Sequence, residues 1–124
     1  MNAITQIFAL VAALVHIWAG TLESFLFHRP EVRKLLTGST NYPPELRLWT
    51  FCQGFYNFGL AAGPIAGVIL LHQDHRAAGQ ALVIYACAFM AVSGVILFIA
   101  DRKLWRGALG QAVPPLIALV AALF

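Results

Sequence analysis

The sequence ITQIFALVAALVHIWAGTLESFLF occupies residues 4–27 and is apolar almost throughout. A helix of about 20 apolar residues is long enough to cross the hydrocarbon core of a bilayer, so this run predicts a membrane helix. Two ionisable side chains interrupt it, His16 near the middle and Glu23 near the end. At about 100° per residue, both share one stripe of the helix with Gly20. Because ionisable groups inside a bilayer almost always face the protein interior or a watery cavity, function is expected on this stripe.

The composition of the whole chain is that of a membrane protein. Of its 124 residues, 60% are hydrophobic and only 10% are charged, whereas ordinary soluble domains carry about 25% charged residues. The net charge of +3 comes from residues in the loops between apolar runs. Aromatic residues do not alternate with Lys and Arg as they do in proteins that bind single-stranded nucleic acid. We therefore expect the lipid bilayer as a partner and no nucleic acid.

Three further apolar runs follow, and together the four predict an all-α fold, an integral membrane four-helix bundle. The expected helices cover about residues 4–27, 46–71, 77–100 and 107–124, within a single domain over residues 1–124. The connector between the first two helices contains three prolines and several basic residues. Residues 31–36 of this connector are expected to form one or two amphipathic turns at the membrane surface.

Lys and Arg are distributed unevenly between the expected loops. The second loop contains only Arg76, whereas the first and third together contain Arg29, Arg33, Lys34, Arg47, Arg102, Lys103 and Arg106. Since cytoplasmic loops carry an excess of Lys and Arg, this bias predicts that both termini face the non-cytoplasmic side.

The second apolar run supplies most of the remaining polar groups. Gln53, Tyr56 and Asn57 stand at positions i, i+3 and i+4 and are expected to share a face of that helix. Gln111 lies one turn into the fourth helix, and Trp49 lies near the expected inner boundary of the membrane. In an antiparallel bundle these side chains and the stripe of the first helix line one polar pocket in the cytoplasmic half of the bilayer.

Three glycines repeat every four residues along an adjacent flank of the second helix, at Gly59, Gly63 and Gly67. Small residues at this spacing let helices approach closely in lipid, so we interpret them as packing positions.

The candidate metal ligands are few and scattered. Cys52 and Cys87 stand alone in apolar runs, and His72 and His75 form a pair in a short outer loop. Metal sites in proteins use three or four strong ligands, so we expect no metal and no cofactor.

The polar residues favour a membrane enzyme or binding protein for a lipophilic small molecule, with acid–base chemistry as the candidate reaction. Glu23 is the candidate general acid or base, His16 the candidate proton shuttle, and Tyr56 completes the catalytic set. The candidate substrate-binding residues are Gln53, Asn57, Gln111 and Trp49. Isomerisation, hydration or cyclisation of a hydrophobic molecule entering from the bilayer suits such groups.

Two other classes of function remain open. One is a proton-linked transporter of small hydrophobic compounds, expected to be a homo-oligomer because four short helices enclose little room for a pathway. The likeness of this chain to the small multidrug resistance exporters is limited to the helix count and one glutamate. The other is an accessory subunit in which the same side chains hydrogen-bond to one another and hold the helices together.

Two stretches resemble a known family: His16 followed by Glu23 and Phe25, and the sequence QGFYN at residues 53–57. They are similar to the small bacterial membrane family catalogued as domain of unknown function 1304, as is the last helix with Gln111, Pro114 and Pro115. The resemblance implies a compact four-helix fold in a bacterial cytoplasmic membrane and brings no established activity. It also marks signature positions, namely His16, Glu23, Gln53, Tyr56, Asn57 and Gln111.

Overall fold

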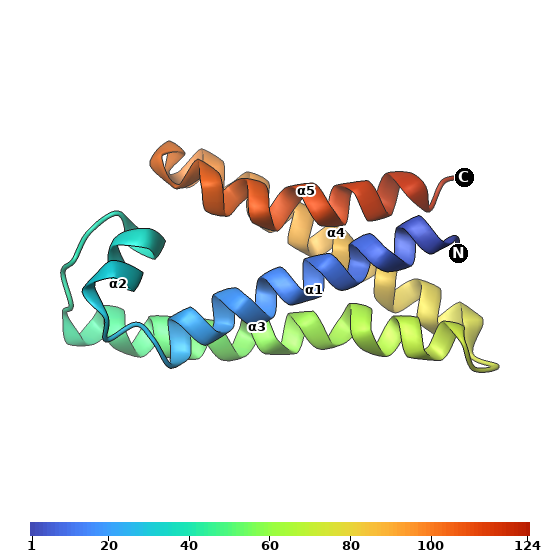
Figure 1. Cartoon of the computed structure of the whole chain (residues 1–124), viewed down its shortest axis with the longest axis horizontal. Coiled ribbons are helices and arrows are strands. Elements are labelled where there is room, and N and C mark those ends of the chain that lie inside the picture. The colour runs from blue at the N-terminus through green and yellow to red at the C-terminus, as the bar shows by residue number, and fades with distance from the viewer.

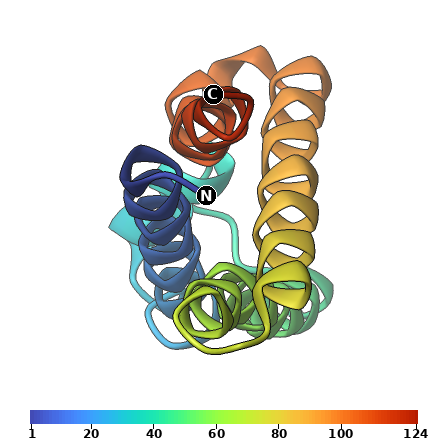
Figure 2. The same cartoon turned by 90° about the vertical axis from the view of Figure 1, so that its right-hand side faces the viewer.

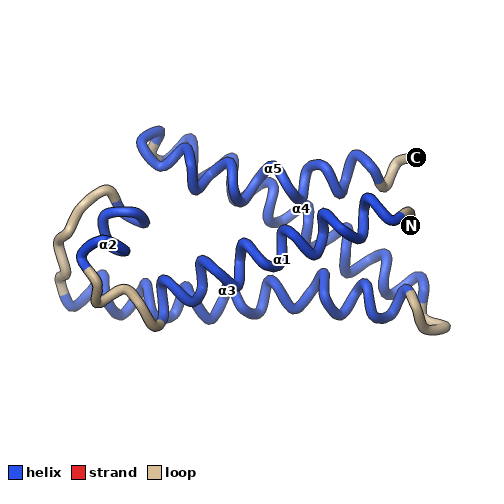
Figure 3. Tube along the Cα trace, viewed as in Figure 1, coloured by secondary structure: helices blue, strands red, loops and turns tan.

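A computed structural model describes every residue of the chain, Met1–Phe124, and it is helical with no strand (Figure 3). Four long helices pack together, which confirms the predicted all-α four-helix fold. Each is long and apolar enough to cross a membrane, judged by length and composition. In chain order the elements are α1 (Ala3–Ser24), α2 (Pro30–Thr37), α3 (Pro44–Leu71), α4 (Arg76–Ala100), the 3-10 turn η1 (Arg102–Leu104) and α5 (Trp105–Ala121).

The four long helices form a ring in which each packs against two neighbours. Helix α1 packs on α3, α3 on α4, α4 on α5, and α5 returns to α1, as the end-on view shows (Figure 2). Both termini and the α3–α4 turn lie at one end of the ring (Figure 1). The connector with α2 and the turn between α4 and α5 lie at the other end.

The first helix ends at Ser24, three residues before the end of the predicted run. The N–H groups of Phe25 and Leu26 both donate to the carbonyl of Thr21, which closes the last turn. The predicted amphipathic turns of the connector are present as α2. Helix α3 begins earlier than expected because proline at its first position fits a helix N-terminus.

The interior of the bundle is made mainly of small side chains, and the large apolar ones face outward. Side chains such as Leu14, Ile99 and Val120 are exposed on the outside. Small residues inside and bulky ones outside are the arrangement expected where lipid surrounds a bundle. The buried alanines are Ala9, Ala12, Ala13, Ala61, Ala86, Ala91, Ala108, Ala112 and Ala118.

Glycines set the closest helix contacts, and the tightest lies between α1 and α3. A Cβ atom added to Gly54 would stand 2.6 Å from the carbonyl oxygen of Gly20 and 2.9 Å from the backbone nitrogen of Ser24, and would also meet the Ser24 hydroxyl. Of the predicted row on α3, Gly67 contacts α4 closely and Gly63 approaches Ala86, as a packing role requires. The interpretation is wrong for Gly59, where an added Cβ would have no neighbour within 4 Å.

We expect Gly54→Ala to destabilise the protein by about 1–3 kcal/mol, because the new methyl group has no room between the two backbones. Gly59→Ala is the matched control: a Cβ there has no neighbour within 4 Å, and alanine favours a helix by up to about 1 kcal/mol. Unfolding by titration with a denaturing detergent measures both. Equal stability of the two variants would contradict this account of the α1–α3 contact.

Candidate functional site

A hydrogen bond between Glu23 and Asn57 joins α1 to α3. The Asn57 side-chain Nδ2 donates to Oε2 of Glu23 at 2.6 Å. Asn57 is only 5% exposed and Glu23 is half-buried. The bond therefore ties a carboxylate at the end of α1 to the interior face of α3.

The glycine contact explains why these two side chains meet. Each stands three residues after its helix's glycine, Glu23 after Gly20 and Asn57 after Gly54. Side chains in a helix lean toward its N-terminus, and α1 and α3 run antiparallel (Figure 1). Both therefore lean back over the point where the backbones approach and meet there.

A pocket of about 170 Å³ lies beside Glu23, between the end of α1, the first turns of α3 and the connector. Liquid water takes about 30 Å³ per molecule, so the space suits several waters or the polar part of a small molecule. Its walls combine aromatic rings with charged and polar groups. The lining residues are Glu23, Ser24, Phe25, Phe27, His28, Tyr42, Arg47 and Phe51.

Arg33 builds the connector side of this pocket. It is buried, and its guanidinium donates to the carbonyls of Phe27 at 3.1 Å, His28 at 2.8 Å and Thr40 at 2.9 Å. The same group lies 4.4 Å from the centre of the Tyr42 ring, and Phe27 packs edge-on against that ring. Because three of these partners line the pocket, Arg33 positions its wall. The sequence marked Arg33 only as a loop charge, and no motif pointed to this role.

His16 is buried in the bundle two turns away from Glu23. Its Nδ1 lies 2.9 Å from the carbonyl oxygen of Ala12, and the residue is 1% exposed. Its other ring nitrogen, Nε2, has no hydrogen-bond partner among the protein groups. Seven residues of helix separate His16 from Glu23 by about 10 Å along the axis. The two side chains share a stripe, as the sequence indicates, without touching.

The other predicted site residues lie apart from the pair. Tyr56 is 68% exposed and Trp49 is 71% exposed, and Gln53 is also exposed. Gln53, Tyr56 and Asn57 lie within one arc of α3, but only Asn57 is buried. The buried face follows Gly54 and Asn57, and Tyr56 points about 100° away from Asn57. Gln111 is half-buried on α5.

No group of three or more His, Cys, Asp or Glu side chains is close enough to hold one metal ion. The two cysteines are free, with Cys87 buried and Cys52 half-buried.

We expect Asn57→Ala to lower the free energy of unfolding by about 1–3 kcal/mol, because it leaves the Glu23 carboxylate without its donor. Glu23→Gln keeps an acceptor oxygen and removes a charge, so its effect should stay below about 1 kcal/mol. Asn41→Ala, at an exposed connector position, is the control. Denaturing-detergent titration of the three variants checks this. An Asn57→Ala protein as stable as the control would show that the hydrogen bond holds nothing together.

We also expect Arg33→Lys to loosen the connector, because an ammonium cannot reproduce the forked bonds of a guanidinium to several carbonyls. Cleavage within residues 38–43 by an added protease should become roughly tenfold faster. This corresponds to lowering the free energy of opening of the connector by about 1.4 kcal/mol. Arg29→Lys, at an exposed position, should cleave like the parent. Unchanged cleavage of Arg33→Lys would remove Arg33 from the account of the pocket.

Comparison with known proteins places the chain in a family. The family model described as a protein of unknown function (DUF1304) matches residues 10–123, which include both Glu23 and Asn57. No curated protein and no solved structure gives a significant match. The chain therefore belongs to the DUF1304 family.

Proposed function

We propose that this protein binds a lipophilic small molecule from the bilayer and converts it by acid–base chemistry at Glu23. One observation carries the proposal: the carboxylate lines a pocket with aromatic walls while a buried amide holds only one of its oxygens. The second oxygen, Oε1, is left to accept a proton or a hydrogen bond from the ligand. A carboxylate held in place beside an apolar surface is the arrangement that general acid–base catalysis uses.

The hydrogen bond from Asn57 gives Glu23 a defined orientation before any ligand arrives. In the proposal, Glu23 exchanges a proton with the ligand, as isomerisation, hydration or cyclisation requires. His16 is too far along α1 to take part directly. Its proposed role as a proton shuttle would need water between its side chain and Glu23.

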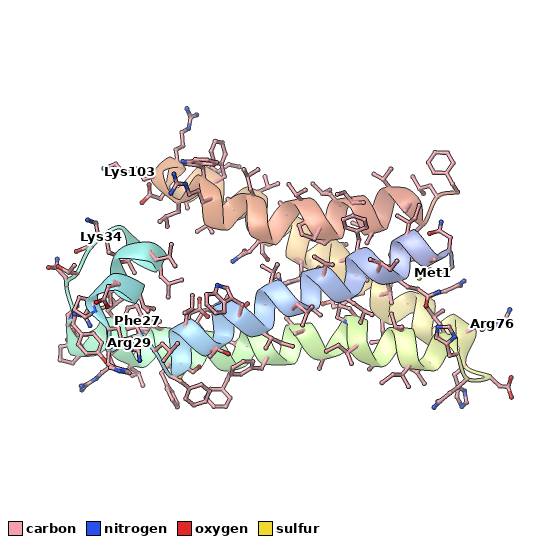
Figure 4. All side chains as sticks on the ribbon, viewed as in Figure 1. Met1, Phe27, Arg29, Lys34, Arg76 and Lys103 are labelled. Carbon is pink, nitrogen blue, oxygen red and sulfur yellow. The ribbon has the colours of Figure 1, made fainter.

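The proposed orientation places the pocket at the cytoplasmic boundary of a bacterial inner membrane. Arg29, Lys34 and Lys103 lie at the α2 end of the molecule, whereas Arg76 lies at the opposite end with Met1 (Figure 4). Cations gather on the cytoplasmic side of membrane proteins. This distribution supports an inward-facing α2 end, with both termini outside.

We expect compounds that raise the thermal unfolding midpoint of the parent to lose this effect in Glu23→Gln. The experiment screens lipophilic compounds against the purified protein. The matched control is Glu45→Gln, which removes an exposed carboxylate of α3 that does not line the pocket, and it should respond like the parent. Stabilising compounds are then incubated with parent protein in detergent, and mass spectrometry with chromatography looks for isomers or for addition of water.

Each result of this screen has a clear reading. Stabilisation that needs Glu23, followed by a changed compound, supports an enzyme. Stabilisation without conversion limits the role to binding, and movement of that compound across sealed vesicles would instead indicate a transporter. If no compound stabilises the parent, or if Glu23→Gln responds fully, the proposed site is wrong and the pair only holds the helices together.

A further inference from the structure

Four phenylalanine rings form a continuous surface on α3 and just after the end of α1, which we call the Phe patch: Phe25, Phe51, Phe55 and Phe58. Phe55 touches each of the others, with ring centres 6.1, 5.2 and 5.7 Å from those of Phe25, Phe51 and Phe58. Phe25 also stacks on Phe58 at 6.2 Å. All but Phe58 are exposed. The patch therefore faces outward, where the bilayer lies if α1 and α3 span it.

The Phe patch is continuous with the Glu23 pocket. Phe25 and Phe51 belong to both, since they line the pocket and contact Phe55 in the patch. A hydrogen bond from the Ser24 hydroxyl to the carbonyl of Phe51, at 2.9 Å, holds the two helices together between them. A molecule on the patch can therefore reach the carboxylate without leaving the surface of the protein.

Charge is arranged in order along the same surface. Arg47 lines the pocket from the first turn of α3, at the end where most cations lie. Asn57, which holds Glu23, comes ten residues later, about 15 Å further along the helix axis. Phe51 and Phe55 lie between Arg47 and Asn57 on α3, and Phe58 follows Asn57. From the end of the bundle inward, the surface therefore presents a guanidinium and then aromatic rings, with the carboxylate that Asn57 holds beside the inner rings.

We infer that the ligand is a single-chain amphiphile with an anionic head, of the fatty-acid class. This inference rests on the proposed function and names its substrate class. The acidic head pairs with Arg47, because a guanidinium is the preferred partner of a carboxylate. The chain runs from Arg47 over the Phe patch, and a polar or unsaturated group along it lies at Glu23. Such a molecule keeps the orientation that it has in the leaflet, with its head at the boundary.

The head, rather than the chain, sets the specificity in this account. In a bilayer, apolar surfaces gain no hydrophobic driving force from touching each other, because lipid tails are equally apolar. The shape of the Phe patch can orient an acyl chain, but the patch does not bind the chain more strongly than the surrounding lipid tails do. Arg47 is exposed, and exposed ion pairs contribute up to about 1 kcal/mol. An acid should therefore be preferred over the alcohol of the same chain by up to about fivefold.

Photochemical labelling tests the inference in nanodiscs of phosphatidylcholine. The probes are palmitic acid with a diazirine in the middle of its chain and the corresponding alcohol, and mass spectrometry maps the labelled peptides. The acid should label residues 51–58 about threefold to fivefold more than the alcohol does, and exposed Phe89 on α4 should be labelled equally by both. Arg47→Gln should remove the preference for the acid, and unlabelled palmitic acid should compete with it.

Arg106→Gln is the matched control, because Arg106 also lies in the first turn of a helix beside an aromatic ring, that of Trp105. It should leave the preference intact. Equal labelling by acid and alcohol, labelling spread evenly over α3 and α4, or loss of the preference in Arg106→Gln would each overturn the inference. If other compounds still stabilise the protein through Glu23, the proposed function survives while this substrate class is withdrawn.

Discussion

The close approach of α1 to α3 at Gly20 and Gly54 is the contact on which the rest of the site depends. With no side chain at either position, the carbonyl of one helix lies against the backbone of the other. The antiparallel helices then aim Glu23 and Asn57 at each other across the contact, because helical side chains lean toward the N-terminus. Since the driving force for helix association in lipid is packing and hydrogen bonding, the glycine contact and this bond act together.

The pocket also needs the connector, which the glycine contact does not build. Arg33 binds three connector carbonyls and stacks on Tyr42, so three backbone groups of an irregular segment at the end of the bundle are hydrogen-bonded. The resulting pocket has the Glu23 carboxylate on its α1 side, and aromatic rings and the guanidinium of Arg47 form the rest of its wall. This combination suits an amphiphile better than a fully apolar or fully polar ligand.

Sequence patterns predicted the helices well because hydrophobic length alone determines membrane-spanning elements. They also pointed to Glu23 and Asn57, since an intramembrane carboxylate and a buried amide need partners. They did not reveal which of Gln53, Tyr56 and Asn57 lies on the buried face of α3, because all three lie within one arc of the helix. In the structure the buried face is the one that contains Gly54. The end of α1 at Ser24 depends on two N–H groups that share the carbonyl of Thr21, and the role of Arg33 depends on its bonds to carbonyls of the connector. Neither has a periodic signal in the sequence.

The most direct test of this account is a dipolar coupling between the two side chains of the central hydrogen bond. Solid-state NMR on protein in lipid, with 15N in the Asn side chains and 13C in the Glu carboxyl groups, measures it. We predict a measurable coupling between the two labelled nuclei, because the Asn57 nitrogen lies 2.6 Å from an oxygen of the Glu23 carboxyl group, and we expect it to disappear in Glu23→Gln. The absence of that coupling in the parent would mean that α1 and α3 do not meet as described, and the pocket and its proposed ligand would lose their basis.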